Sequence, residues 1–287
     1  MEKNHFVKSH GLGNEYVVLD SENISFELTD SNITKICNVH FGIGSDGILL
    51  KVPSKKADFG LKIFNPDGSE AEKSGNGLRI FSKFLFDYQW SKGTDFSIET
   101  KGGIVNASVI VSVQKRAKTI RVDMGKAIFE SKLIPVLCNK PECMDEPLTI
   151  EDTTFSINCV SVGNPHCVIL RDNLVVDQIK KYGPLIENNK LFPHRINVQF
   201  AKVLTDKEVQ ILIWERGAGF TLASGSSSCA VASVLLKKGL IQPNVTIKML
   251  GGELAIGIDN SWNIRMTGEV KQIAEGNLSA ELLDELE

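Results

Sequence analysis

The sequence has almost no excess charge of either sign and no long apolar run. Its 287 residues carry a formal net charge of −3, so there is no basic field to attract nucleic acid and no acidic tail typical of disorder. No run approaches the roughly 20 apolar residues that cross a membrane, and residues 1–10 lack the apolar core of a signal peptide. We therefore expect a cytoplasmic protein that binds neither nucleic acid nor membrane and whose partner is a small molecule.

The cysteines are scattered along the chain, and no two of them form a CxxC pair. The six are Cys37, Cys138, Cys143, Cys159, Cys167 and Cys229. In a reducing compartment such isolated cysteines are buried thiols rather than disulfides. Cys138 and Cys143 come closest to a metal-ligand spacing, but no histidine or second cysteine pair accompanies them. We therefore predict no disulfide and no metal site.

The chain repeats itself with an offset of 150 residues. Three landmarks share this offset: Gly13-Asn14 with Gly163-Asn164, Ser74-Gly75 with Ser224-Gly225, and Asn65 with Glu215. One match could arise by chance, but three in one register indicate two copies of one domain. The chain is also longer than a typical single domain. We predict a first lobe of residues 1–123, completed by a returning strand within residues 269–287, and a second lobe of residues 124–268, joined near Met124-Gly125.

Short runs rich in β-branched residues and bounded by Gly, Pro, Asn or Asp predict strands in both copies. In the first copy they are residues 16–19, 59–64, 96–100, 105–111 and 119–123. In the second copy they are residues 157–162, 168–170, 196–200, 208–214, 246–250 and 262–266. Apolar residues at helical spacing follow each Ser-Gly pair, so each copy is predicted to place one helix among many strands. The fold class is therefore α+β.

The two Ser-Gly helix starts are the strongest local signals. Small residues in Ser74-Gly75-Asn76-Gly77 and Ser224-Gly225-Ser226-Ser227 leave backbone N–H groups uncovered at the positive end of a helix dipole. Two such starts can hold a substrate carboxylate from both lobes at once. Serine is also a favoured N-cap, and for either serine alone that structural role is the simpler interpretation.

Polar residues at predicted strand ends form a second candidate set. Four asparagines belong to it, Asn14, Asn65, Asn164 and Asn197, although each alone can simply cap a turn. Glu215-Arg216 ends an apolar run; it is either a surface ion pair or an arginine fork for a second substrate carboxylate. His166 is either a core histidine or a functional one, and its place in the repeat favours function. The loop Gly42–Gly47 lacks the lysine and spacing of a nucleotide loop, and we expect it to be a tight turn that supports the first helix start.

These residues belong to a series of motifs that resembles the diaminopimelate epimerase family along nearly the whole chain. The series is His10-Gly11-Leu12-Gly13-Asn14, Gly42-Ile43-Gly44-Ser45-Asp46-Gly47, Asn65-Pro66-Asp67-Gly68-Ser69-Glu70, Gly75-Asn76-Gly77-Leu78-Arg79, Gly163-Asn164-Pro165-His166, Arg195-Ile196-Asn197-Val198 and Glu215-Arg216-Gly217-Ala218-Gly219. The resemblance implies two pseudo-symmetric lobes, each a β-barrel-like sheet around a central helix, in a homodimer. It also implies an amino-acid substrate and no cofactor.

The family's mechanism uses two cysteines, one from each lobe, on opposite faces of the substrate α-carbon, and the matching positions here are Ser74 and Ser224. By the same resemblance His166 and Glu215 join the catalytic set. The substrate-binding set is Asn14, Asn65, Gly75, Asn76, Asn164, Asn197, Glu215, Arg216, Gly225 and Ser226. A hydroxyl loses its proton far less readily than a thiol, so we expect epimerisation to be greatly slowed.

Because the remaining pocket residues are all present, we favour a deliberate exchange of both cysteines for serine, which would hold substrate, over natural loss. Two alternatives stay open. One is a racemase of another amino acid, such as a broad-specificity or histidine racemase, against which Arg216 argues. The other is a non-catalytic amino-acid binding protein in which both serines are native helix caps.

Overall fold

The computed structural model describes residues 2–286; Met1 and Glu287, the two ends of the predicted first lobe, lie outside the described residues. The chain divides into two compact units. Unit 1 comprises the residues up to Val122 together with the segment from Gly268 onwards, and unit 2 is Asp123–Thr267. Each unit is described by itself below.

Unit 1 is a mixed sheet with a long central helix. Its elements are β1 (His5–Gly11), β2 (Asn14–Asp20), α1 (Asp30–Cys37), β3 (Ile48–Val52), β4 (Phe59–Phe64), β5 (Glu70–Ala71), α2 (Gly75–Asp87), β6 (Asp95–Thr100), β7 (Gly103–Val113), β8 (Arg116–Lys126), β18 (Lys271–Asn277) and α5 (Ala280–Asp284). The strands pair in the order β18-β1-β2-β3-β4-β6-β7-β8, with β5 also on β4. Only β2–β3 and β4–β6 of these pairs are parallel.

Unit 2 contains a corresponding set of elements. They are η1 (Ser131–Leu133), β9 (Glu146–Ile150), β10 (Thr153–Ser161), β11 (Pro165–Leu170), α3 (Val176–Glu187), β12 (Asn197–Thr205), β13 (Glu208–Glu215), β14 (Gly219–Thr221), α4 (Gly225–Lys237), β15 (Asn244–Met249), β16 (Gly252–Ile258) and β17 (Asn263–Glu269). The strands pair in the order β9-β10-β11-β12-β13-β15-β16-β17, with β14 on β13. The α+β class predicted from the sequence is confirmed.

The pairing register also repeats with the offset of 150 residues. Val17 lies opposite Ile48 on the parallel neighbour strand in unit 1, and Cys167 lies opposite Val198 in unit 2. Ile48 in turn pairs with Phe64, as Val198 pairs with Trp214. A one-residue slip would turn every side chain to the other face of the sheet, so a shared register means that equivalent residues point to the same face of the sheet in both units.

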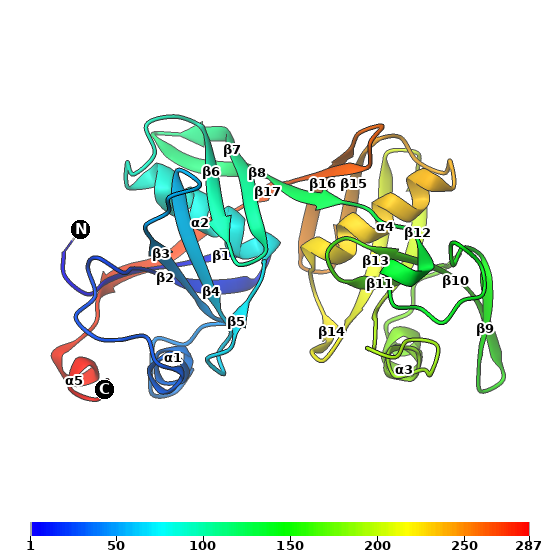
Figure 1. Cartoon of the computed structure of the whole chain (residues 1–287), viewed down its shortest axis with the longest axis horizontal. Helices are drawn as coiled ribbons and strands as arrows, with labels where there is room; N and C mark the ends of the chain where they lie inside the picture. The colour runs from blue at the N-terminus through cyan, green and yellow to red at the C-terminus, as the bar shows by residue number, and fades with distance from the viewer. Residues whose placement is uncertain (1, 287) are drawn as a thin grey trace. The chain divides into compact units, whose positions relative to one another are not determined.

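Helices α2 and α4, of 13 residues each, are capped by serines and are buried over most of their length. Ser74 and Ser224 are the N-caps of α2 and α4, and both have extended backbone angles. Helix α2 packs against β1, β2 and β7, and α4 packs against β10, β11, β12 and β16. Figure 1 shows each of these helices lying against the strands of its own unit. The fold therefore places the first turn of α2 and of α4 close to the polar ends of neighbouring strands.

The prediction of one helix per copy is wrong, because α1 and α3 are additional helices. Helix α3 contains Gly183 and Pro184, which disfavour a helix in the sequence pattern, and α1 has only eight residues. Both connect parallel strands, and Figure 1 shows them at the lower edge of their units. The predicted junction at Met124-Gly125 lies within β8, so the chain leaves unit 1 along a strand.

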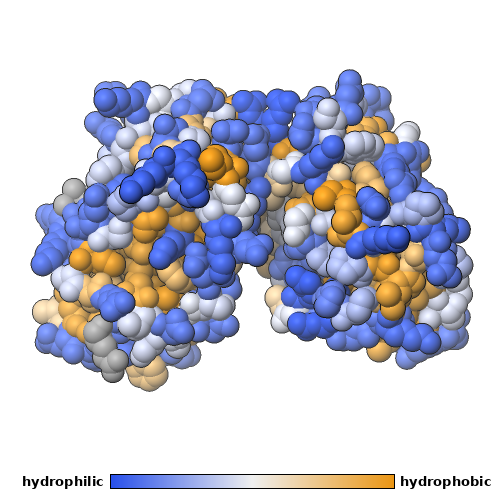
Figure 2. Space-filling model, in the orientation of Figure 1, coloured by the Kyte–Doolittle hydropathy of each residue, from blue (hydrophilic) through white to orange (hydrophobic). Residues whose placement is uncertain are grey.

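Two apolar cores match the two units. In unit 1, residues of α1, β2 and β3 such as Ile33, Leu19 and Ile48 are fully buried together. In unit 2 a larger core joins β10, β11, β12 and α3, and it includes Cys143, Cys159 and Cys167. All six cysteines are free. Figure 2 shows predominantly polar residues with separate apolar patches on the face in view. Within residues 2–286 no helix has the length and apolarity needed to cross a membrane.

Candidate active site

Ser74 lies between β5 and α2, directly before the first residue of the helix. Its extended backbone lets the hydroxyl turn back, so that Oγ accepts a hydrogen bond from the Gly77 N–H at 3.0 Å. The same oxygen lies 3.2 Å from the Tyr16 hydroxyl of β2. Ser74 is therefore a helix cap and is also bonded to a buried phenol that the sequence analysis did not single out.

Two predicted asparagines of unit 1 meet at this helix start. The Asn76 Nδ2 donates to Asn14 Oδ1 at 3.2 Å, and the Asn14 amide donates to Asp46 Oδ2 at 2.9 Å. Arg79, fully buried one turn further along α2, donates to Asn76 Oδ1 at 2.7 Å and to the Gly75 carbonyl at 3.1 Å. This buried guanidinium adds positive charge to the positive end of the helix dipole.

Asn65 is not bonded to these residues. It ends the β4 hairpin, where its side chain donates to Ser69 Oγ at 2.9 Å and its backbone N–H donates to the Ser69 carbonyl at 2.9 Å. This matches the turn-capping interpretation of an isolated asparagine. Any contact between Asn65 and substrate stays a proposal.

In unit 2, Ser224 occupies the place that Ser74 has in unit 1. Its Oγ accepts from the Ser227 N–H at 3.4 Å, and it lies 3.5 Å from the Ser226 hydroxyl. Glu215, at the end of β13, reaches the same serine: burial raises the pKa of the Glu215 carboxyl, and a hydrogen bond with Ser224 partly opposes that rise. Here a carboxyl group accompanies the serine, whereas Ser74 is accompanied by a phenol.

Asn164, His166 and Asn197 lie side by side at the start of β11 and β12. His166 Nε2 and Asn164 Oδ1 are 2.8 Å apart, and the Asn197 amide donates to the Pro165 carbonyl at 2.8 Å. His166 is completely buried, and burial, with a smaller contribution from the charge of Arg216, lowers its pKa to about 3. The imidazole is therefore neutral at neutral pH, as a core histidine is.

Arg216 follows Glu215 in an exposed turn. Its backbone N–H donates to Asn197 Oδ1 at 3.0 Å, and its guanidinium donates to the His194 carbonyl at 3.2 Å. No ion pair joins Arg216 to Glu215 in the described chain, so the alternative of a surface ion pair is not realised. The guanidinium keeps most of its donors for a ligand.

Glu187 at the end of α3 is a structural partner that the sequence analysis missed. Its carboxylate is buried and accepts from the Gly217 N–H at 2.9 Å, from Trp214 Nε1 at 2.7 Å and from Arg195 Nη1 at 3.2 Å. These bonds fix the turn that carries Glu215 and Arg216. The sequence pattern gave no signal for Glu187, because helix α3, which it ends, was not predicted.

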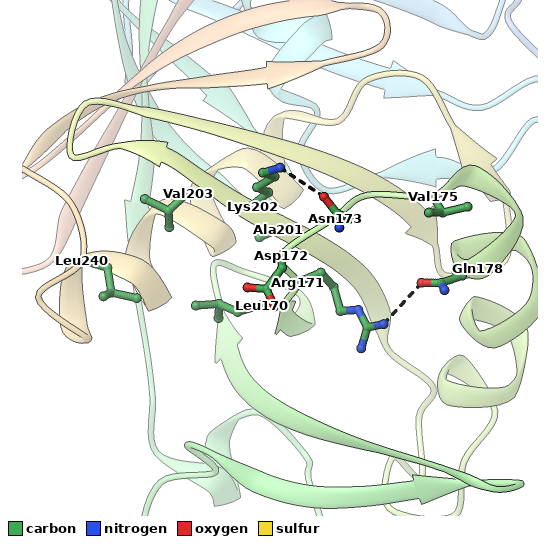
Figure 3. Close-up of a pocket in the computed structure, with 10 residues that line it drawn as sticks. All are labelled: Leu170, Arg171, Asp172, Asn173, Val175, Gln178, Ala201, Lys202, Val203 and Leu240. Carbon is green, nitrogen blue, oxygen red and sulfur yellow. Dashed lines mark hydrogen bonds between the residues drawn. The ribbon is translucent and has the colours of Figure 1, made fainter.

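A separate pocket of about 760 Å³ lies at the other end of β11 and β12. Figure 3 shows Arg171 bonded to Gln178 and Lys202 bonded to Asn173 beside it. None of the predicted site residues lines this pocket. Among residues 2–286, no three His, Cys, Asp or Glu side chains gather closely enough to hold a metal ion.

Comparison with known proteins identifies relatives along nearly the full length. The family described as diaminopimelate epimerase matches residues 6–130 and 158–273. The diaminopimelate epimerase 2 of a Nostoc species is 48% identical over 278 residues, which cover 96% of each chain. The diaminopimelate epimerase of Methanococcus maripaludis is 39% identical over 274 residues, covering 95% of this chain and 99% of the relative.

Solved structures with much lower sequence identity share the fold. A hydroxyproline epimerase from Agrobacterium vitis has a TM-score of 0.70 at 13% identity, covering 96% of this chain and 90% of the other. A phenazine biosynthesis protein of the PhzF family from Bacillus anthracis has a TM-score of 0.67 at 15% identity, covering 97% and 100%. These structures support the two-lobed α+β fold, and the sequence relatives decide the family: the chain belongs to the diaminopimelate epimerase family.

Proposed function

We propose that this chain binds diaminopimelate through residues at the first turn of α2 and at the first turn of α4, and that it is a form of a diaminopimelate epimerase with little or no activity. The proposal rests on the observation that Ser74 and Ser224 are the N-caps of α2 and α4, which are equivalent helices of the repeat. In the proposed reaction, one group removes the α-proton of LL- or meso-diaminopimelate and a second delivers a proton to the opposite face. No pyridoxal phosphate takes part.

The hydrogen-bond donors around each serine support this assignment. Backbone N–H groups of the first turn point towards Ser74 Oγ and Ser224 Oγ, and such donors stabilise an anion at the cap position. A thiolate there would be stabilised. A serine hydroxyl holds its proton too firmly to be the base unless a neighbouring group activates it.

We propose that Arg216 binds the second carboxylate of diaminopimelate. Its side chain is exposed, and its backbone N–H donates to Asn197 Oδ1 at 3.0 Å. This bond fixes the backbone of Arg216 and leaves the guanidinium able to pair with a carboxylate in a bidentate fashion. We assign substrate contacts to Asn14, Asn65, Asn76, Asn164 and Asn197, and to the first-turn residues Gly75, Gly225 and Ser226. His166, being buried and neutral, would act by holding Asn164 in place.

The proposal also includes a cytoplasmic location and a homodimer. The six thiols are free and mostly buried, which suits a reducing compartment. Size-exclusion chromatography with light scattering measures the oligomeric state, and a monomer mass would remove the homodimer from the proposal.

Calorimetry tests the central proposal directly. The chain is titrated with LL-diaminopimelate, meso-diaminopimelate, lysine and histidine, and α-hydrogen exchange is followed in deuterated water. We expect binding of diaminopimelate in preference to the monocarboxylates, with exchange near background. Preference for lysine or histidine would favour a racemase of another amino acid, and rapid exchange would show that serine chemistry suffices.

A non-catalytic amino-acid binding protein is the second candidate, and the cap hydrogen bonds of both serines favour it. Binding alone does not separate the two candidates. They differ in what happens when both serines are replaced by cysteine, because a binding site that never carried the reaction has no acid and base placed about the α-carbon.

A further inference from the structure

The Tyr16 side chain contacts Ser74 from outside helix α2. Its ring is 7% exposed, and its hydroxyl lies 3.2 Å from Ser74 Oγ. Because a phenol can both donate and accept a hydrogen bond, Tyr16 is able to respond to the charge of whatever side chain occupies position 74.

The loop Gly42–Gly47 holds the backbone on both sides of Tyr16. The Asp46 carboxylate accepts from the Glu15 N–H at 3.0 Å, and the Ser45 hydroxyl accepts from the Val17 N–H at 3.1 Å. Ser45 also donates to the Gly47 carbonyl at 2.6 Å. The residues before and after Tyr16 are thus tied to one loop, which restricts the direction of the ring.

Gly47 of this loop makes room for the ring itself. A Cβ atom at Gly47 would lie 2.8 Å from Tyr16 Cε1 and 2.3 Å from the Phe64 carbonyl oxygen, closer than such atoms approach in proteins. A side chain at position 47 would therefore displace either the tyrosine or β4. The loop that lacks the features of a nucleotide site thus has a structural purpose, the placement of Tyr16 against position 74.

We propose that Tyr16 is a positioning residue that orients the side chain at position 74 and lowers its proton affinity by donating a hydrogen bond to its anionic form. This inference rests on the proposed function only in taking position 74 as the base of unit 1. An anion at position 74 has no proton to give, so the phenol becomes the donor in a charge-assisted bond. That bond adds to the one from the Gly77 N–H and favours the charged form.

The repeat makes this effect specific to unit 1. The residue that corresponds to Tyr16 in unit 2 is His166, which is bonded to Asn164. Ser224 is instead accompanied by Glu215, whose carboxyl pKa is raised mainly by burial. A carboxyl group disfavours a second anion beside it when it is ionised, whereas a neutral phenol favours one. The two positions are therefore chemically unequal.

The experiment measures the pKa of a thiol placed at position 74. Alkylation rates of the Ser74→Cys protein with iodoacetamide are recorded from pH 6 to 10, and the rate of the parent protein, with its six native cysteines, is subtracted. The measurement is repeated with Tyr16→Phe added, which keeps the ring and removes the hydroxyl. We expect the thiol pKa to rise by about one to two units, as loss of a hydrogen bond to a charged group predicts.

Two controls isolate the effect. Tyr88→Phe removes a phenol at the opposite end of α2, one that is bonded to Glu275, and should leave the thiol pKa at position 74 unchanged. Tyr16→Phe should likewise leave unchanged the pKa of a thiol introduced as Ser224→Cys. An unchanged or lower pKa at position 74 after Tyr16→Phe overturns the proposal, as does an equal shift from Tyr88→Phe.

A kinetic measurement distinguishes failure of this inference from failure of the proposed function. In the protein with both serines replaced by cysteine, Tyr16→Phe should move the acidic limb of the kcat profile to higher pH and leave KM unchanged. If that protein does not epimerise diaminopimelate, the proposed function fails while the alkylation result still decides the role of Tyr16. If it epimerises and the acidic limb does not move, the role of Tyr16 is wrong.

Discussion

Replacing Ser74 and Ser224 together by cysteine should create epimerase activity, and the size of the gain follows from proton affinity. An ordinary thiol has a pKa of about 8.5, so about one tenth is thiolate at pH 7.5. A serine hydroxyl holds its proton about as firmly as water does, so its pKa lies far above that of a thiol, and its alkoxide population is about 10⁷-fold lower. Even if most of this difference is offset by the greater basicity of an alkoxide, we expect kcat to rise by at least about 10³-fold.

The structure indicates a second contribution to the gain in activity, and it also indicates a loss of stability. The Gly77 N–H lies 3.0 Å from Ser74 Oγ, and the Ser227 N–H lies 3.4 Å from Ser224 Oγ. These donors favour a thiolate and lower the thiol pKa towards neutrality. A neutral thiol is a poorer cap acceptor than a hydroxyl, so each exchange should lower the free energy of unfolding by about 1 kcal/mol, measurable by urea denaturation.

The assay compares four proteins: the chain with both serines, the two single variants and the double variant. Chiral chromatography follows the conversion of LL- into meso-diaminopimelate, and deuterium incorporation reports proton abstraction. Each single variant has a thiolate on one side only, so it should exchange hydrogen slowly from one stereoisomer without full reversible inversion. Alkylation should abolish the activity of the double variant, and substrate should protect it.

The result that would refute the reasoning is a double variant that binds diaminopimelate yet leaves its configuration unchanged. The assignment of Ser74 and Ser224 to the catalytic positions would then fail, and a binding protein with native serine caps would be favoured. Equal activity in all four proteins would refute the proposed role of thiolate chemistry.

Three further predictions follow from contacts in unit 2. Arg216→Ala should weaken diaminopimelate binding at least about tenfold while monocarboxylate binding is retained, by calorimetry; equal losses for both ligands would contradict a fork for the second carboxylate. Glu187→Gln should lower the free energy of unfolding by about 1–3 kcal/mol, because a buried carboxylate with three donors is lost, whereas the half-exposed Glu208→Gln should cost under about 0.5 kcal/mol. His166 keeps a pKa of about 3 when folded against the usual 6.5, so below pH 6.5 only the unfolded chain takes up its proton and stability falls as pH drops. In urea denaturation, His166 should contribute about 1.4 kcal/mol per pH unit to the slope of the free energy of unfolding against pH. This contribution should vanish in His166→Gln and persist in the exposed His40→Gln.

Local patterns were sufficient to predict the repeat and most strands. The offset of 150 residues appears in the register of the sheets, where Val17 faces Ile48 and Cys167 faces Val198. Strand signals succeed because alternation and bounding residues are local properties of the chain. Helices α1 and α3 were missed, since one is short and the other contains Gly183 and Pro184.

The sequence alone also determined that Ser74 and Ser224 begin helices, because a cap depends on residues within one turn. It left open whether His166 lies in the core and whether Glu215 pairs with Arg216. Those questions depend on burial and on partners far along the chain, which periodicity does not report.

Only the tertiary structure decided which groups accompany each helix start. Tyr16 reaches Ser74 across 58 residues of sequence, and Glu187 reaches Gly217 across 30. Both contacts exist because sheet pairing and helix packing bring distant segments within hydrogen-bond distance, and a hydrogen bond requires a donor and an acceptor about 3 Å apart. The sequence by itself determines the kinds of groups available, but the pairing of strands and the packing of helices determine which of them meet.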